Sequence, residues 1–154
     1  MIKSQDLNAR MWYHASQHMI RDFENGAPGE GIHFGDIDQA KMRSSGYLHE
    51  VALRSQNPKR VKDQQSWKKT AQRARSAGAD VLVYLNRYEG LSVDRVMDLI
   101  KDGTLDRLDD MSDAAVRKRI PEAQDSLLVL YPDIILPRRI CVTSGTLILE
   151  HEPI

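Results

Sequence analysis

The sequence predicts one α+β domain built around a mainly antiparallel β-sheet. Short segments that favour strands are interspersed with segments of helical periodicity, without the strict strand–helix–strand alternation of a parallel sheet. The 154 residues suit one domain with a buried core. Hydrophobic residues make up 41% and charged residues 29%, which is typical of a globular protein. We therefore treat residues 1–154 as a single domain.

Strands are expected where apolar residues run together or alternate with polar ones. Val81–Leu85 is a continuous apolar run after a glycine, which predicts a buried strand. Tyr47–Arg54 has alternating strand character, and Asn57–Pro58 is expected to end it. Ser144–Gly145 predicts a hairpin turn between the last two strands. The other expected extended segments are Met11–Ala15, Ile32–Phe34, Leu127–Tyr131, Ile134–Leu136, Arg139–Thr143 and Thr146–Glu150.

Helices are expected between these segments. Gln64–Ala77 places small and aromatic residues along one side, and Gly78 suits its C-cap. Ser16 is expected to cap a helical turn that runs to Phe23. Asn25–Gly31 contains three glycines and a proline and predicts a loop. The remaining expected helices are Asp36–Arg43, with an aspartate near its cap, Ser92–Ile100 and Met111–Arg119.

Charge and cysteine content narrow the class of protein. Lys plus Arg and Asp plus Glu each total 22, and a net charge of zero argues against bulk nucleic-acid binding. Residues 59–75 are basic and residues 94–113 mostly acidic, and solvated helix faces account for both. The single cysteine, Cys141, allows no intrachain disulfide. With no apolar run of about 20 residues and no apolar N-terminal stretch, we expect a cytoplasmic location and no membrane partner.

Four segments, in order, carry the candidate chemistry. The first, Trp12–Ser16, ends in His14, Ala15 and a hydroxyl-bearing residue. The others are the glycine-flanked Gly29–Gly35 with Asp38-Gln39-Ala40 after it, the segment Gly78-Ala79-Asp80-Val81-Leu82-Val83-Tyr84-Leu85-Asn86-Arg87-Tyr88-Glu89-Gly90, and Asp125–Pro132. In this order and spacing they resemble the ADP-ribosyltransferase superfamily. The likeness is greatest to the small domains of phage and mobile-element polyvalent proteins.

The resemblance covers about 120 residues, from Tyr13 to Pro132, and residues 91–124 look like a helical insertion within it. It implies a split antiparallel β fold, flanked by helices, that binds NAD⁺ between two small sheets. His14 would then hold a ribose hydroxyl, while the backbone at Ala15 and its neighbour Ser16 would pair with the nicotinamide amide. The superfamily commonly places a stacking tyrosine where this chain has Met42 or Arg43.

Other site residues also follow from the resemblance. An aromatic ring of suitable orientation from His33, Phe34 or Tyr47 would replace the missing tyrosine. Arg43 or Arg21 would pair with the pyrophosphate. The resemblance assigns the catalytic carboxylate to Glu89, with Asp125 as the alternative. Such a carboxylate would steady the positive charge that develops as nicotinamide leaves.

Other chemistries have less support in the sequence. His14 and His18 have a metal-ligand spacing only on a helix, and the turn predicted at Ser16 breaks that geometry, so we expect no metal. Cys141 has no paired histidine, and Ser126 lacks the G-x-S-x-G elbow of hydrolases. Taken alone, His14 suits a structural histidine, and Glu89 suits a solvated loop residue.

The resemblance therefore predicts an NAD⁺-dependent mono-ADP-ribosyltransferase that modifies a host protein or another macromolecule, as a phage effector would. Two alternatives stay open at this point. An NAD⁺ glycohydrolase would use water in place of the acceptor. A catalytically degenerate domain would use the same fold as a binding or interaction module, and the absent stacking tyrosine favours it.

Overall fold

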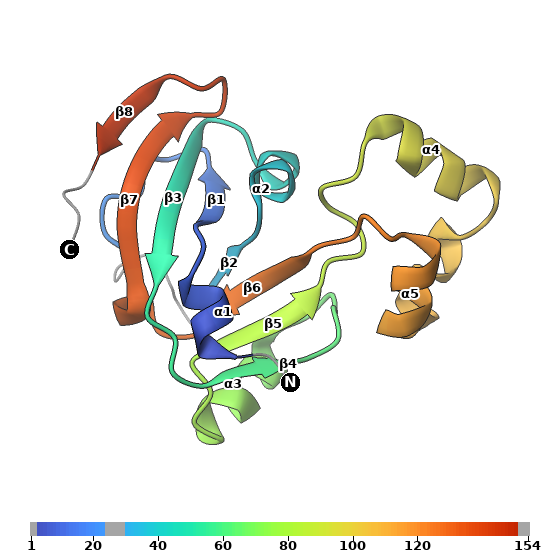
Figure 1. Cartoon of the computed structure of the whole chain (residues 1–154), viewed down its shortest axis with the longest axis horizontal. Coiled ribbons are helices and arrows are strands. Elements are labelled where there is room, and N and C mark those ends of the chain that lie inside the picture. Colours follow the sequence, from blue (N-terminus) through green and yellow to red (C-terminus); the bar gives the residue numbers. More distant parts are fainter. Residues whose placement is uncertain (1–2, 24–29, 151–154) are drawn as a thin grey trace.

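The computed structural model of the chain describes residues 3–23 and 30–150. Two four-stranded sheets form its centre (Figure 1). One has the strand order β1-β3-β7-β8 and is antiparallel throughout. Its strands are β1 (Trp12–Ser16), β3 (Tyr47–Leu53), β7 (Ile135–Val142) and β8 (Leu147–Glu150).

The second sheet has the order β2-β6-β5-β4 and is antiparallel except where β4 and β5 run parallel. Its strands are β2 (Ile32–Phe34), β4 (Pro58–Arg60), β5 (Val81–Leu85) and β6 (Asp125–Val129). A backbone bridge between Tyr13 and Gly35 joins β1 to the residue after β2. The two sheets confirm the α+β class and the mainly antiparallel pairing.

The helices cover the sheets from several sides. Among the described residues, the 3₁₀ segment η2 (Leu105–Asp110) lies between α4 and α5, and η3 (Pro132–Ile134) lies between β6 and β7. The α-helices are α1 (Ser4–Asn8), α2 (Ile37–Arg43), α3 (Lys68–Ser76), α4 (Val93–Lys101) and α5 (Asp113–Arg119). Serines at positions 92 and 112 cap α4 and α5 through their side-chain oxygens. None of the described helices is both long and apolar enough to cross a membrane.

Strand β5 shows why the two layers form. All five of its residues are buried, because alternate side chains enter different cores. Val81 and Val83 pack between the two sheets, whereas Leu82 and Tyr84 pack under α3. The core between the sheets also takes Trp12, Phe23, Ile32, Phe34, Val51, Leu53, Leu127, Val129 and Ile135. Burial on both faces makes this strand the centre of the fold.

The segment between β5 and β6 has its own apolar cluster. Helices α4 and α5 lie together at one side of the molecule, away from the β1-β3-β7-β8 sheet (Figure 1). The cluster consists of Leu85, Leu99, Leu108, Val116 and Ile120, with partly buried neighbours around it. Leu85 is the last residue of β5, so the strand end connects this cluster to the sheet.

Arg87 fixes this helical segment to the rest of the molecule. Only 1% of its surface is exposed, although its side chain is charged. Its guanidinium forms an ion pair of 2.8 Å with Asp113 and donates hydrogen bonds to the carbonyls of Leu108 and Met111. A buried cation needs such partners to offset its lost hydration.

Several local predictions were wrong. Residues 17–22 form no helix, because the Ser16 hydroxyl donates to the His18 carbonyl rather than capping, and the Ile20 N–H donates to His49. The strand that begins at Tyr47 ends at Leu53, before Asn57–Pro58 as expected, but Pro58 then opens β4, a strand that was not expected, at the sheet edge, where its missing N–H costs nothing. The loop predicted at residues 25–31 lies largely outside the described residues.

Other predictions were right in type but not in bounds. Helix α3 begins at Lys68, four residues later than expected, and β6 spans Asp125–Val129 rather than Leu127–Tyr131. Strand β7 is continuous where two pieces were expected, and the pairing register with β3 shifts near Pro137 because proline has no N–H to donate. The hairpin turn at Ser144–Gly145 is confirmed, with Gly145 at a φ of 111°.

We predict that Arg87→Ala lowers the free energy of unfolding by about 2 kcal/mol or more, since it leaves two carbonyls without their donor. The measurement is urea unfolding. Arg107→Ala is the matched control, because Arg107 is exposed and makes one weak bond to Gly103. Equal midpoints for the two variants would contradict the structural role of Arg87.

Candidate functional site

A small cavity lies where the two sheets meet, and we call it the inner cavity. Its volume is about 10 Å³, close to that of a single water site. The lining residues come from β1, β2, α2, β5 and β6 and from the turn after β5. They are Tyr13, His14, Ala15, His33, Phe34, Gly35, Gln39, Ala40, Arg43, Tyr84, Glu89 and Ser126.

A larger recess adjoins it, which we call the outer cavity. Its volume is about 380 Å³, within the range of small-molecule sites. His33, Arg43, Tyr84 and Glu89 line both cavities, so these side chains form the boundary between them. The rest of the outer wall consists of Glu30, Asp63, Gln64, Gln65, Trp67, Asn86 and Tyr88.

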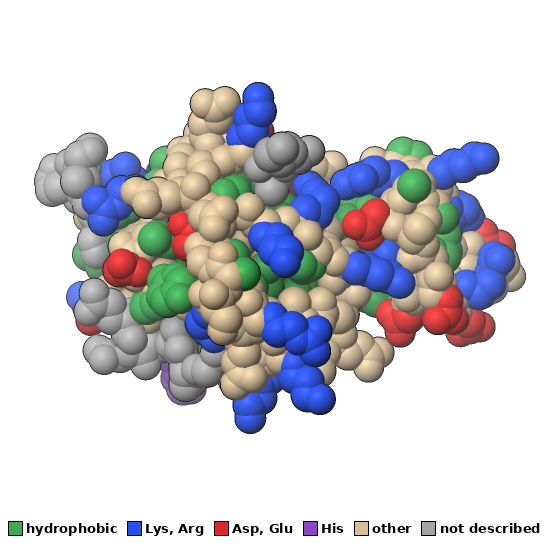
Figure 2. All heavy atoms as spheres, turned by 90° about the horizontal axis from the view of Figure 1, so that it is seen from below, with side chains coloured by type: hydrophobic (Ala, Val, Ile, Leu, Met, Phe, Trp, Pro, Cys, Tyr) green, Lys and Arg blue, Asp and Glu red, His purple; other side chains and the backbone are tan. Residues whose placement is uncertain are grey.

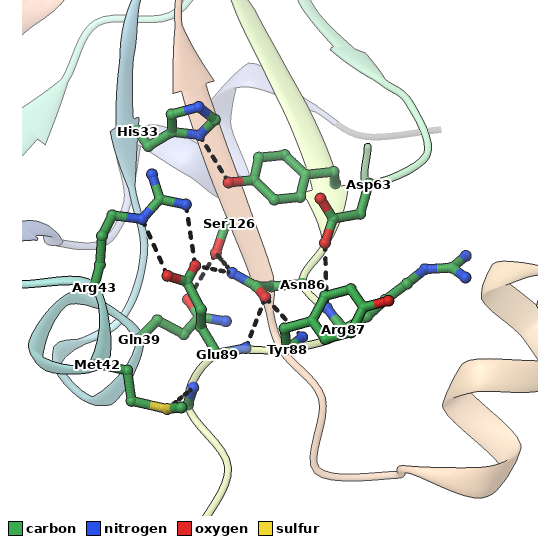
Figure 3. A network of polar contacts seen from close by, with 12 residues as sticks. His33, Gln39, Met42, Arg43, Asp63, Asn86, Arg87, Tyr88, Glu89 and Ser126 are labelled. Atoms are coloured by element: carbon green, nitrogen blue, oxygen red, sulfur yellow. Dashed lines mark hydrogen bonds and ion pairs between the residues drawn. The ribbon is translucent and has the colours of Figure 1, made fainter. Parts of the chain in front are cut away.

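Glu89 and Arg43 form the boundary as an ion pair (Figure 3). The Arg43 Nε and Nη2 atoms each donate to one Glu89 carboxylate oxygen over 3.1 Å. Burial lowers the pKa of Arg43, but the hydrogen bonds and charge of Glu89 more than offset this, so the pKa is raised overall. The side chains are 36% and 22% exposed, which leaves both reachable from solvent.

A chain of buried amides and a hydroxyl holds Glu89 from the other side (Figure 3). The Asn86 Nδ2 atom donates to the Glu89 carboxylate over 2.8 Å and to the Ser126 hydroxyl over 2.9 Å. Ser126 in turn donates to Gln39 Oε1 over 2.9 Å. Asn86, Ser126 and Gln39 are each no more than 3% exposed. These hydrogen bonds orient the Glu89 carboxylate before any ligand binds.

Local structure explains how Gln39 and Asn86 reach these positions. Gln39 is the third residue of α2 and forms a capping box with Asp36. Asn86 follows β5, and its Oδ1 accepts from the backbone N–H groups of Tyr88 and Glu89, which fixes the turn that presents the carboxylate. A Cβ at Gly35 would lie 2.3 Å from Gln39 Oε1, so glycine is required there.

His14 and His33 are both held neutral beside the inner cavity. Burial lowers the pKa of His14 and lowers that of His33 to about 3, where the charge of Arg43 acts in the same direction. His14 Nδ1 lies 2.7 Å from the His33 carbonyl, which only accepts, so Nδ1 carries the proton and Nε2 can accept. His33 Nδ1 lies 2.9 Å from the Tyr84 hydroxyl.

His49 has a structural role in the wall behind His14. Its Nδ1 lies 3.0 Å from the His14 carbonyl, and its Nε2 accepts from the Ile20 N–H over 2.9 Å. Burial lowers its pKa, and both ring nitrogens have partners in the neutral form. This residue was not predicted from the sequence, because no local pattern distinguishes it.

The structure brings six of the eight predicted site residues to the inner cavity. They are His14, Ala15, His33, Phe34, Arg43 and Glu89. Ser16 and Tyr47 face each other at the end of the β1–β3 pair and line neither cavity. Arg21 lies in a separate hollow, with Asp22 and Arg54. Of the two arginines considered for a pyrophosphate, only Arg43 lines the inner and outer cavities.

The other residues considered in the sequence lie apart from these cavities or have another role. Asp125 forms a bidentate ion pair with Arg60 at 2.7 to 3.0 Å and lines neither cavity. Met42, at the position of the expected tyrosine, is 50% exposed, and its sulfur accepts from the Gly90 N–H. Within residues 3–23 and 30–150, no group of three or more histidine, cysteine or acidic side chains could hold a metal ion.

Gln39, Asn86 and Ser126 were not predicted from the sequence as site residues. Asn86 could have been found from its spacing three residues before Glu89, which is typical of a side chain that caps its own turn. Gln39 could have been found from the capping-box spacing with Asp36. Ser126 has no comparable local pattern.

No family model matches this chain, and neither a curated protein nor a solved structure shows significant similarity to it.

The lowered pKa of His33 predicts that the folded protein loses stability in acid. Because folding lowers the pKa of His33 to about 3, the unfolded chain binds its proton near pH 6.5 and the folded chain does not. Stability contributed by neutral His33 is therefore lost as pH falls below about 6.5. Between about pH 7.5 and 5.5 this loss is about 1.4 kcal/mol.

Urea unfolding at the two pH values measures the loss, and His33→Gln should reduce it by about that amount. His18→Gln is the control, since His18 lines neither cavity. An identical pH dependence in wild type and His33→Gln would contradict the prediction.

We also predict that Asn86→Ala lowers the free energy of unfolding by about 2–3 kcal/mol, since it removes the amide group that donates to Glu89 and Ser126 and the oxygen that accepts from two backbone N–H groups of the turn. Ser126→Ala should cost less. A double-mutant cycle of Asn86→Ala and Ser126→Ala in chemical unfolding measures the coupling energy between the two residues. A coupling energy near zero would show that their hydrogen bonds form independently.

Proposed function

We propose that this chain has an ADP-ribosyltransferase-like fold, binds NAD⁺ across the inner and outer cavities and transfers its ADP-ribose to a macromolecule. One observation carries the proposal. Six residues named from the superfamily resemblance, on four separate segments of the chain, line one cavity beside an oriented carboxylate. The alternative acid, Asp125, is paired with Arg60 outside that lining, which supports Glu89 as the catalytic group.

Each group has a physical role in this proposal. Among the described residues none hydrogen-bonds to His14 Nε2, so it is available to accept from a ribose hydroxyl. Glu89 would stabilise the oxocarbenium-like charge that develops as the nicotinamide bond breaks. Because Glu89 lies between the two cavities, an acceptor beside it would reach the ribose carbon that the nicotinamide leaves. The acceptor would then attack, and its proton would pass to the carboxylate.

Arg43 would have two partners in turn. In the unliganded chain it neutralises Glu89 through two hydrogen bonds. A pyrophosphate offers the same bidentate geometry and more charge, so it would compete for the guanidinium and release the carboxylate. The inner cavity holds only about 10 Å³ while the pair is closed, which means that NAD⁺ binding requires this rearrangement.

A non-catalytic NAD⁺-binding module is the second candidate. The same ion pair favours it, because a carboxylate held by an arginine is a poorer base and a poorer stabiliser of positive charge. The exposed Met42 also leaves no stacking ring at the usual position. An NAD⁺ glycohydrolase remains the third outcome that an assay distinguishes.

We predict that purified protein consumes labelled NAD⁺ and labels a discrete protein in a bacterial lysate. Glu89→Gln should reduce turnover about 100-fold or more while leaving NAD⁺ binding in place. Asp125→Asn is the matched control and should retain turnover, since it lines neither cavity.

The outcomes separate the candidates. Free ADP-ribose without a labelled macromolecule selects the glycohydrolase. Saturable NAD⁺ binding without turnover selects the module. Absence of NAD⁺ binding in wild type rejects all three.

A further inference from the structure

A strongly basic face lies on the side of the molecule opposite the β1-β3-β7-β8 sheet. Figure 2 shows Lys and Arg side chains gathered over the face seen from below, where β4 and α3 lie in Figure 1. We call Lys59, Lys68, Lys69 and Arg73 the basic face, and all four are exposed. Lys59 shares its strand face with Val61, which packs against the core under α3.

The charges on this face are not balanced by neighbouring acids. Helix α3 contains no acidic residue, and the four basic side chains form no ion pair with any residue between 3–23 or 30–150. The nearby acids are already engaged. Asp125 pairs with Arg60, and Asp80 accepts hydrogen bonds from the turn at residues 55–57.

The arrangement is unfavourable for the isolated helix. Lys68 and Lys69 occupy the first turn of α3, where the helix dipole disfavours positive charge. Lys69 and Arg73 are four residues apart, so like charges repel along one face. Each effect costs a few tenths of a kcal/mol. An anion bound at this face would relieve both.

The composition of the face indicates which kind of anion it suits. None of the large exposed hydrophobic side chains of the described chain falls between residues 54 and 76. Membrane-surface helices need an apolar side to insert, and protein interfaces are depleted in lysine. Single-stranded nucleic acid stacks successive bases on exposed aromatic rings. Of the described aromatic residues beside α3, Trp67 is buried and Tyr131, with Arg75 over its ring, is 40% exposed, so this side of the helix offers one ring rather than a series. What remains is the phosphate backbone of a duplex, which is recognised by charge alone.

We propose that the basic face binds the phosphate backbone of duplex nucleic acid without reading its sequence. This proposal departs from the expectation that a zero net charge argues against bulk nucleic-acid binding, because binding depends on the local potential of the segregated face and not on the charge of the whole chain. Trp67, which precedes α3, lines the outer cavity, so a bound duplex would lie along the edge of that cavity. The proposal concerns binding and does not depend on NAD⁺ chemistry.

The test is fluorescence anisotropy of the full chain with a labelled DNA duplex of random sequence. With about four phosphate contacts, affinity should fall about 100-fold between roughly 50 and 200 mM salt. A triple variant, Lys68→Glu, Lys69→Glu and Arg73→Gln, should weaken binding at least about 10-fold and reduce the salt dependence by about three contacts.

The matched control makes the same substitutions on the helical segment: Lys101→Glu, Lys118→Glu and Arg117→Gln. These residues are equally exposed, and the control should bind the duplex as wild type does. The basic-face variant should unfold at or slightly above the wild-type midpoint, because it removes unfavourable charges from the start of α3, and the control should unfold slightly below it, because it removes cations from the last turns of α4 and α5. Several outcomes would overturn the proposal: no binding at low salt, equal losses in both variants, or tighter binding to polyglutamate or anionic vesicles than to the duplex.

Discussion

The buried hydrogen-bond chain from Gln39 through Ser126 to Asn86 is the constraint on which the candidate site depends. It connects α2, β6 and the turn after β5, and every member is almost completely buried. Leaving a buried amide without partners would cost more free energy than its hydrogen bonds contribute to stability. The hydrogen bonds from Gln39 to Asn86 therefore form together or not at all. The position of Glu89 is therefore set by the packing of three elements together with the turn that Asn86 holds.

The electrostatics of the cavities follow from the same packing. Burial keeps His14 and His33 neutral, which leaves Arg43 and Glu89 as the charged pair that separates the two cavities. A neutral histidine beside the pair neither competes for the carboxylate nor repels an incoming cation. The site thus combines uncharged hydrogen-bonding groups with one exchangeable ion pair, a combination suited to a ligand that carries both hydroxyls and phosphates.

Charge is also segregated at the level of the whole molecule. The helical segment that carries most of the acidic run is held by Arg87 and by its own apolar cluster. The basic residues of the basic face lie on other elements, α3 and β4, and α3 contains no acidic residue. Separation of this kind lets a chain with no net charge present a face with a strong local potential.

Much of this protein could be predicted from the sequence, where the determinants are local. The apolar run Val81–Leu85 predicts a buried strand because any such run must be removed from water, and Ser92 predicts a helix start because its hydroxyl reaches the next turn. The order of short motifs also singled out His14 and Glu89, which the structure places beside one cavity.

What only the tertiary structure decided involves residues far apart in the chain. Gln39 meets Ser126 across 87 positions, and Arg43 meets Glu89 across 46. The helical turn expected after Ser16 does not form, and the Ile20 N–H in that segment donates to the distant His49 ring. Local periodicity and capping determine which elements form, since their energies depend on neighbours along the chain. The packing of the two sheets decides which polar groups share a cavity, because burial makes a hydrogen-bond partner obligatory only after the layers meet.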